Sequence, residues 1–412
     1  MADNENQRIM NKNENNMDSS NTSSRIPKLR FPGFTGEWEE KKLGEMAEFK
    51  RGTTITAKET VDGDVPVIAG GQTPSYYHNV ANREGQTIAI SGSGAYAGFV
   101  SFWETPVFLS DSFSVDTNSE LDRKYLFYYL KHRQHALFQL QKGAGVPHVH
   151  GSDVGELYIP FPSSLAEQQK IAECLSELDN LITAQGQKVD ALKEKKKGLM
   201  QQLFPQKGET VPRLRFPGFE EEWNEKKLGD ILVERKEVSV ITEELPQLSF
   251  TIAEGVIRPE DRKTNQRDFL MKDKDSKKFS ITRLNDIIYN PANVVYGAIH
   301  KNNLCDGVVS PIYKIFWTNE NADFINYLLR RPSFISTLSS HAEGTVTKLK
   351  TLKAEAFLEL SVPFPVDPSE QQKIAECLSA LDETIVAEAD KLEALKNHKK
   401  GLMQQLFPQP SK

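Results

Sequence analysis

The sequence is poor in cysteine, in long apolar runs and in excess basic charge. Its only cysteines, Cys174, Cys305 and Cys377, form no metal-spaced cluster. We therefore expect reduced thiols in a cytoplasmic protein rather than a disulfide framework, a metal site or a catalytic thiol. No apolar run is long enough to cross a bilayer, and the first residues hold no hydrophobic signal region, so no membrane association is expected.

Nucleotide-binding and catalytic motifs are missing as well. There is no P-loop, and the glycines of residues 92–98 have the wrong spacing for a dinucleotide fingerprint. Residues 290–293 read NPAN and lack the second proline and the aromatic residue of an adenine-methyltransferase motif. Acid-x-lysine triplets at Asp261 and Asp275 have no suitable partner acid and are interpreted as surface charge. We expect no catalytic residue, metal or cofactor in this chain.

The charge is acidic, with 57 Asp and Glu against 51 Lys and Arg and a formal net charge of −6. Between Met46 and Pro160 there are 9 basic and 12 acidic residues, and between Ile231 and Pro365 there are 18 and 17. A protein that binds nucleic acid by itself is expected to be basic. The composition alone therefore does not favour a chain that binds nucleic acid without partners.

The sequence contains two long stretches that each occur twice. EQQKIAECLSELDNL begins at Glu167, and EQQKIAECLSALDET begins 203 residues later at Glu370. KLRFPGFTGEWEEKKLGE from Lys28 returns 185 residues later as RLRFPGFEEEWNEKKLGD from Arg213. The chain is therefore a tandem duplication in which the segment between the repeated stretches is 18 residues longer in the second half.

Each copy of the longer stretch has apolar residues at alternating steps of three and four, which is the pattern of a coiled-coil helix. The two helices share length and register, so we expect them to pair antiparallel, with Gln185 near Glu388. The alternative is that each helix packs only on its own globular half. The residues expected to pair are Ile171, Leu175, Leu178, Ile182, Gln185, Val189, Leu192, Leu199, Ile374, Leu378, Leu381, Ile385, Glu388, Leu392, Leu395 and Leu402.

The ends of both helices are marked in the sequence. Ser164 with Glu167 predicts a capping box, and residues 367–370 offer a cap, a first-turn proline and the same glutamate. Phe204-Pro205 and Phe407-Pro408 end the two helices. At a rise of about 1.5 Å per residue, each helix should be about 60 Å long.

The remaining pattern predicts two mixed α/β modules. Short strands are expected at 65–70, 87–90, 98–103, 113–115, 287–290 and 313–317, with helices from Asp122 and Asp323. The LRFPGF segments are predicted to be packed structural latches. The predicted domains are a disordered leader at 1–24, a first module at 25–163, a first helix at 164–206, a second module at 207–365, and a second helix with its tail at 366–412.

The complete arrangement resembles the DNA-specificity subunit of type I restriction-modification enzymes. The resemblance rests on the two variable modules, each opened by LRFPGF, closed by PFP and EQQKIA, and followed by a helix ending in GLMQQLFP. It implies two target recognition domains, each reading one half of a bipartite, asymmetric DNA site. It also implies an antiparallel coiled coil that spaces the domains and docks two methyltransferase subunits, which restriction subunits join. S-adenosylmethionine, ATP and Mg²⁺ would belong to those partners.

Two other classes of function stay open at this stage. A self-contained restriction or methylation enzyme is disfavoured by the missing motifs. A coiled-coil adaptor that binds only protein would leave two divergent modules without an evident purpose.

Basic, polar and glycine-rich loops supply the candidate contacts with double-stranded DNA, because Arg pairs with guanine, Asn and Gln with adenine, and Lys with phosphate. An ordinary solvated turn is the alternative for each loop. His148 and His150 alternate but lack a third metal ligand. The candidates are Lys50, Arg51, Ser91, Ser93, Tyr96, Lys142, His148 and His150 in the first module and Arg262, Lys263, Asn265, Arg267, Asn290, Asn293, Tyr296, His300, Lys301, Lys348 and Lys350 in the second.

Overall fold

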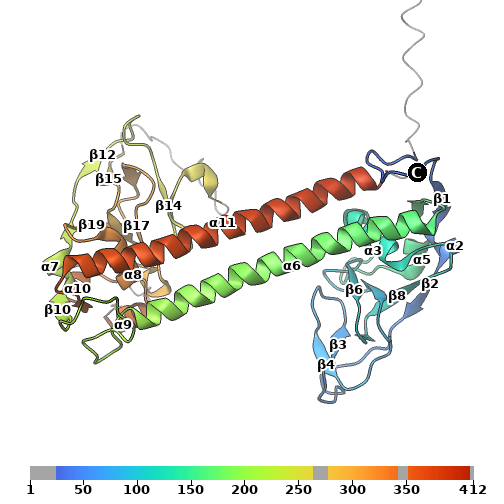
Figure 1. Cartoon of the computed structure of the whole chain (residues 1–412), viewed down its shortest axis with the longest axis horizontal. Helices are drawn as coiled ribbons and strands as arrows, with labels where there is room; N and C mark the ends of the chain where they lie inside the picture. Colours follow the sequence, from blue (N-terminus) through green and yellow to red (C-terminus); the bar gives the residue numbers. More distant parts are fainter. Residues whose placement is uncertain (1–24, 263–276, 342–350, 409–412) are drawn as a thin grey trace, which may run out of the picture. The chain divides into compact units, whose positions relative to one another are not determined.

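The computed structural model describes residues 25–262, 277–341 and 351–408 (Figure 1). The chain divides into two compact units, Met1–Gln185 with Lys391–Lys412, and Gly186–Asp390. Each unit holds one globular module together with part of both long helices. The limits of the two units lie inside the long helices. Within the described residues no helix is long and apolar enough to span a membrane.

The first unit contains a module of short strands and helices followed by α6 (Figure 1). The strands expected at 65–70, 87–90, 98–103 and 113–115 are present, whereas the helix expected from Asp122 is interrupted at Arg133. The elements are β1 (Glu39–Lys42), α2 (Leu43–Met46), β2 (Ala47–Arg51), β3 (Val65–Ile68), β4 (Tyr76–His78), β5 (Thr87–Ser91), β6 (Val100–Trp103), β7 (Phe108–Leu109), β8 (Ser112–Thr117), α3 (Arg123–His132), α4 (Gln134–Gln139), α5 (Gly151–Gly155), β9 (Tyr158–Phe161) and α6 (Leu165–Gln202).

The second unit repeats this order with additional strands. The predicted strands at 287–290 and 313–317 and the helix near Asp323 are confirmed. The elements are β10 (Asn224–Lys227), α7 (Leu228–Ile231), β11 (Val233–Glu234), β12 (Val238–Ser239), β13 (Ser249–Thr251), β14 (Gly255–Ile257), η1 (Pro259–Asp261), β15 (Phe279–Thr282), β16 (Ile287–Tyr289), η3 (Val294–Tyr296), β17 (Ile299–Lys301), β18 (Gly307–Val309), β19 (Lys314–Trp317), α8 (Ala322–Leu329), α9 (Pro332–His341), α10 (Ala354–Leu358), β20 (Ser361–Phe364) and α11 (Pro368–Leu406).

The two modules share the topology of their main sheets. The first has the strand order β2-β8-β5-β6 and the second β11-β19-β16-β17, and the described pairs in both sheets are antiparallel. In each module the strand after the LRFPGF segment pairs with the strand just before the long helix, as β1-β9 and β10-β20. The hairpin β13-β14 accounts for part of the extra length of the second module.

Both long helices contribute to the core of each unit. In the first, Ile171 and Leu175 of α6 share a core with Leu406 and Phe407 from the end of α11. In the second, Leu203 and Phe204 after α6 share a core with the start of α11. Every residue predicted to lie in the helix seam is buried or half-buried.

Polar residues tie the helices together within each unit. In the second unit Lys188 pairs with Glu388, and Lys196 lies 2.6 Å from Asp382. Positions therefore rise along α6 as they fall along α11, so these parts of the helices run antiparallel. The predicted approach of Gln185 to Glu388 involves both units and stays a prediction.

Lys196 of α6 and Lys399 of α11 occupy polar positions within the apolar patterns of the two helices, and each pairs with an aspartate that also contacts a module. Lys196 pairs with Asp382, whose carboxylate also accepts a hydrogen bond of 2.8 Å from Tyr327. In the other unit Lys399 pairs with Asp179, which accepts 2.9 Å from Tyr128. Each of these lysines thus links two helices to a module.

The LRFPGF segments are held by buried ion pairs, as expected for structural latches. Arg30 donates to both carboxylate oxygens of Glu167, at 2.7 and 2.8 Å. Arg215 contacts Glu370 in the same way, at 2.7 and 2.9 Å, and Trp223 Nε1 adds a third donor at 3.1 Å. Glu167 and Glu370 are each 1% exposed.

These contacts correct the predicted capping boxes. The carboxylates of Glu167 and Glu370 bind arginines far away in sequence instead of the backbone at the start of their own helices. The Asp367 cap is confirmed, because its Oδ1 accepts 2.8 Å from Ser369 N. The local sequence pattern was that of a capping box, but an arginine brought close by the fold satisfies the carboxylate more completely.

Candidate nucleic-acid interface

Loops at one edge of the β2-β8-β5 sheet enclose a cavity of about 550 Å³ in the first unit. The sheet pairs Arg51 with Phe113 and Ser91 with Ser112, so the ends of β2 and β5 and the start of β8 meet at this edge. The loop before α5 closes it, since Val149 N donates 3.0 Å to Gly92 O. We call this cavity the β2-β5-β8 groove.

The groove brings together four of the predicted contact residues. Arg51, Ser93, His148 and His150 all line it, and the two imidazole rings are parallel with centroids 6.4 Å apart. Arg51, His148 and His150 are exposed. Asp111, which the sequence analysis missed, adds a carboxylate acceptor.

A glycine at the floor of the groove is required by packing. A Cβ on Gly151 would lie 2.7 Å from Cβ of Phe49, so a larger residue would force the loop before α5 away from β2. Because the first residue of α5 lacks a side chain, residues 142–152 can bring His148 and His150 to the groove.

The groove presents donors and acceptors, and among the described residues no ion pair is formed by Arg51. Guanidinium, imidazole, hydroxyl and carboxylate groups are the ones that read base edges in DNA. Within the described residues no group of three or more His, Cys, Asp and Glu side chains has the arrangement of a metal site.

The other candidates in the first module lie outside the groove. Lys50 is 3.1 Å from both Glu48 and Asp116, and Lys142 is 2.7 Å from Asp153, so their charges are already paired. Tyr96 is 45% exposed and lines no part of the groove.

Ser91 is a structural residue. It is 2% exposed, and its hydroxyl faces the carbonyl groups of Ala69 and Gly71. Because Ser91 is buried, we remove it from the candidate interface.

In the second module the candidates form a turn between β16 and β17. Tyr296 is 73% exposed, and Asn293 lies at the start of η3. Asn290 shapes this turn, since its Oδ1 accepts 3.0 Å from Ala292 N. Gly297 ends η3 at a φ of 86°, a left-handed conformation that favours glycine. We call residues 290–297 the β16-β17 turn.

His300 and Lys301 do not lie in an exposed loop, contrary to the prediction. Both lie in β17 and are buried, at 6% and 8% exposure. His300 Nε2 lies 2.8 Å from the carbonyl of Ile252, and burial lowers the His300 pKa to about 4, so the ring is neutral at pH 7. Lys301 pairs with Asp323 at 2.6 Å. A stretch interpreted as one polar loop contains a short core strand.

The remaining candidates of the second module are at or beyond the limits of the described residues. Arg262 is described, and its Nε is buried without a hydrogen-bond partner among the described atoms. The predictions that fall outside the described residues are Lys263, Asn265, Arg267, Lys348 and Lys350.

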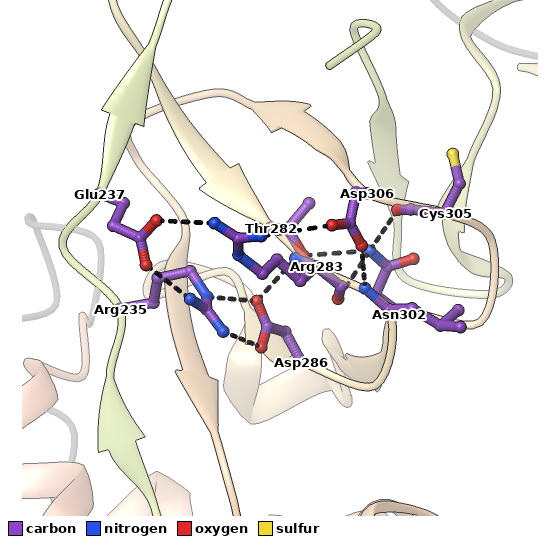
Figure 2. Close-up of polar contacts among 9 residues, drawn as sticks. Arg235, Glu237, Thr282, Arg283, Asp286, Asn302, Cys305 and Asp306 are labelled. Atoms are coloured by element: carbon purple, nitrogen blue, oxygen red, sulfur yellow. Dashed lines mark hydrogen bonds and ion pairs between the residues drawn. The ribbon is translucent and has the colours of Figure 1, made fainter. Parts of the chain in front are cut away.

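Arginines elsewhere in the second module are used internally, as Figure 2 shows. Arg235 donates to both oxygens of Asp286, at 2.7 and 3.0 Å, and to Glu237 at 2.6 Å. Arg283 lies 3.1 Å from Glu237 and 3.6 Å from Asp306. This network stabilises the strands and turns around Asp286, and its arginines already have counter-ions.

The described chain thus consists of two modules with main sheets of one topology, each followed by a long helix and each presenting a different set of polar loops. The family described as Type I restriction modification DNA specificity domain matches residues 35–194 and 220–397. The chain belongs to this family and carries two copies of its domain.

Known proteins similar to this chain include a specificity subunit and two solved structures. The chain is 24% identical over 411 residues to the type I restriction enzyme MjaVIII specificity subunit of Methanocaldococcus jannaschii, covering 92% of this chain and 93% of that protein. It superposes with a TM-score of 0.66 and 18% identity on the type I restriction-modification S subunit from M. genitalium, covering 93% of this chain and 100% of that one. A chain from a structure of type I R-M complex assembly and conformational transition gives 0.50 at 14% identity, covering 92% and 99%.

Proposed function

We propose that this chain reads a bipartite, asymmetric DNA site, with one half-site for each module, inside a type I restriction-modification complex. The proposal is carried by the different chemistry of two topologically equivalent modules. The first offers Arg51, His148, His150 and Asp111 in the β2-β5-β8 groove, whereas the second offers the β16-β17 turn. Two different reading surfaces select two different half-sites, so the target has no palindromic symmetry.

We further propose that α6 and α11 space the modules and dock two methyltransferase subunits, and that restriction subunits join this assembly. The chain itself is then a non-catalytic subunit acting in the cytoplasm. Those partner subunits would bind S-adenosylmethionine, ATP and Mg²⁺. The antiparallel helix contacts within each unit and the family membership support this role.

Methylome sequencing tests the proposed function directly. Cells that contain this chain and its methyltransferase subunit are compared with the same cells lacking this chain. We expect a bipartite, asymmetric methylated motif that disappears on deletion. An unchanged methylome, with both proteins present and bound to each other, would contradict the proposal and favour an adaptor that binds only protein.

A substitution in the β2-β5-β8 groove should affect one half-site only. Arg51→Ala removes an exposed guanidinium that lines the groove. A bidentate contact between Arg and guanine contributes about 1–3 kcal/mol of discrimination, so affinity for the cognate duplex should fall about 5-fold to 150-fold. Fluorescence anisotropy of the assembled complex on duplexes with single changes in either half-site measures this.

The neighbouring Lys50 provides the matched control. Lys50→Ala removes a cation that Glu48 and Asp116 already pair, so the affinity and the motif should be little changed. Equal losses for Lys50→Ala and Arg51→Ala, or relaxed specificity in the half-site read by the second module, would contradict the assignment of the groove.

A further inference from the structure

A basic cavity of about 660 Å³ lies in the second unit, and none of the residues labelled in Figure 2 lines it. It is formed by the last turns of α6, the segment after it, and the turn between α8 and α9. Its basic side chains are those of Lys193, Lys196, Lys197, Arg213, Arg330 and Arg331. We call it the α6-α9 cavity.

Four of these cations have acidic neighbours. Lys196 lies 2.6 Å from Asp382, and Lys197, Arg213 and Lys193 lie 3.3, 2.9 and 3.8 Å from acidic residues three or four positions away. Lys193, Lys197 and Arg213 each have a single carboxylate partner on an exposed pair, whereas Lys50 lies between two carboxylates, and single exposed pairs contribute little. These lysines and Arg213 therefore stay able to bind a further negative group.

Arg330 and Arg331 have no ion pair within the described ranges. Arg331 is 7% exposed; its Nε donates 3.0 Å to Leu328 O and its Nη1 3.3 Å to Pro205 O. Its guanidinium lies 4.9 Å from the Phe204 ring centroid. Burial lowers the Arg331 pKa to about 10, which leaves it charged at pH 7. A buried cation with only neutral partners is costly, and an anion in the cavity would compensate it.

The start of α9 faces the same space. Pro332 and Ser333, the first two residues of this 10-residue helix, line the α6-α9 cavity. The N-terminal end of a helix carries partial positive charge and free backbone N–H groups, which favour an anion. Lysines, a buried arginine and a helix N-terminus therefore converge on one cavity.

The position of α9 connects the cavity with the β16-β17 turn. Phe334 and Leu338 of α9 lie in the same core as Val294 of that turn. Ten residues of helix span about 15 Å, so the turn and the cavity lie within reach of one DNA duplex, whose strands carry a phosphate about every 3.4 Å along the axis. DNA read by Tyr296 would place phosphates beside the cavity.

We propose that the α6-α9 cavity binds backbone phosphates of the DNA next to the half-site of the second module. This inference rests on the proposed function. It also supplies a location for phosphate binding in a chain whose net charge is −6 and whose Arg235 and Arg283 are already paired.

The first unit differs at the equivalent place. The repeat aligns Arg330 and Arg331 with Lys131 and His132. Lys131 Nζ donates 3.1 Å to Val100 O and lies 4.3 Å from the Phe99 ring centroid. Burial lowers the His132 pKa, which favours the neutral ring. The second unit thus has the more cationic version, and the first provides matched control positions.

The test is the salt dependence of DNA binding by the full-length chain assembled with its methyltransferase subunit. The variant Lys193→Ala, Lys197→Ala and Arg330→Ala changes only exposed residues. The slope of log K against log salt is negative, and each lost phosphate contact reduces its magnitude by about 0.9. We expect this magnitude to fall by about 1–3 and the affinity at about 0.15 M salt to fall about 10-fold or more, equally for cognate and unrelated duplexes. The methylated motif should be unchanged.

The control variant is Lys396→Ala with Lys400→Ala, which removes the lysines equivalent to Lys193 and Lys197. Its slope should remain close to that of the wild type. An equal loss in both variants would overturn the inference and assign the effect to the general charge of the helices. An unchanged slope with loss of the methyltransferase subunit would show that the cavity binds a protein partner. A wild-type complex that selects no motif would refute the proposed function itself.

Discussion

A seven-residue insertion made at matched places in α6 and α11 is expected to separate the two halves of the methylated motif by about three more base pairs. Seven helical residues add about 10 Å, and each base pair occupies about 3.4 Å of duplex. One heptad also restores the apolar seam to its register. Positions after Gln185 and after Glu388 lie near the middle of the helices, away from both modules.

The bases read in each half-site should be unchanged by this insertion, because the β2-β5-β8 groove and the β16-β17 turn are far from the inserted residues in sequence. Methylome sequencing gives both the spacing and the bases in one experiment. The control is the same insertion in α6 alone, which should abolish methylation by mismatching the helices. An active variant with both insertions and the wild-type spacing between half-sites would contradict the prediction that the helices set this spacing.

Removing the carboxylate of Glu370 should destabilise the second unit strongly. Glu370→Ala removes the carboxylate from Arg215, which keeps only the carbonyl of Glu221, and leaves the buried Trp223 Nε1 without its acceptor. Breaking a buried ion pair from one side costs about 3–5 kcal/mol, and we expect about 3 kcal/mol because the Arg215 side chain is 13% exposed. Urea unfolding followed by circular dichroism measures the change.

The duplicated chain contains its own comparison for this prediction. Glu167→Ala removes only the contact with Arg30, because Trp38 Nε1 is buried without a partner among the described atoms. Glu370→Ala should therefore be more destabilising than Glu167→Ala by about 1 kcal/mol, the contribution of one further hydrogen bond. The exposed Glu173→Ala should change little. Equal stability of all three variants would contradict the structural role of the ion pairs.

The parts of the fold that the sequence predicted are those with a repeated or periodic signal. The duplication, the helix seam from Ile171 and the order of strands and helices follow from spacing alone, and the family from the doubled arrangement. The ion pair between Glu167 and Arg30 could not be predicted from spacing. The capping-box pattern at Glu167 is local, whereas Arg30 is 137 residues away in the sequence.

The candidate interface was predicted only in part for a related reason. Ser93 and His148 lie in polar loops that composition identifies and Arg51 ends β2, but Asp111 joins them only through sheet pairing. The errors at His300 and Lys301 arose because β17 is three residues long, too short to show the alternation of a strand.

The participation of α11 in the first unit has a consequence for biosynthesis. Leu406 and Phe407 are 1% exposed, and the Phe407 ring packs edge-on against Tyr125 and Tyr129. The core of the first module is thus completed by residues that leave the ribosome after the whole second module has been made. N-terminal domains usually fold first during synthesis. The core of this first module, however, stays incomplete until residue 407 has left the ribosome.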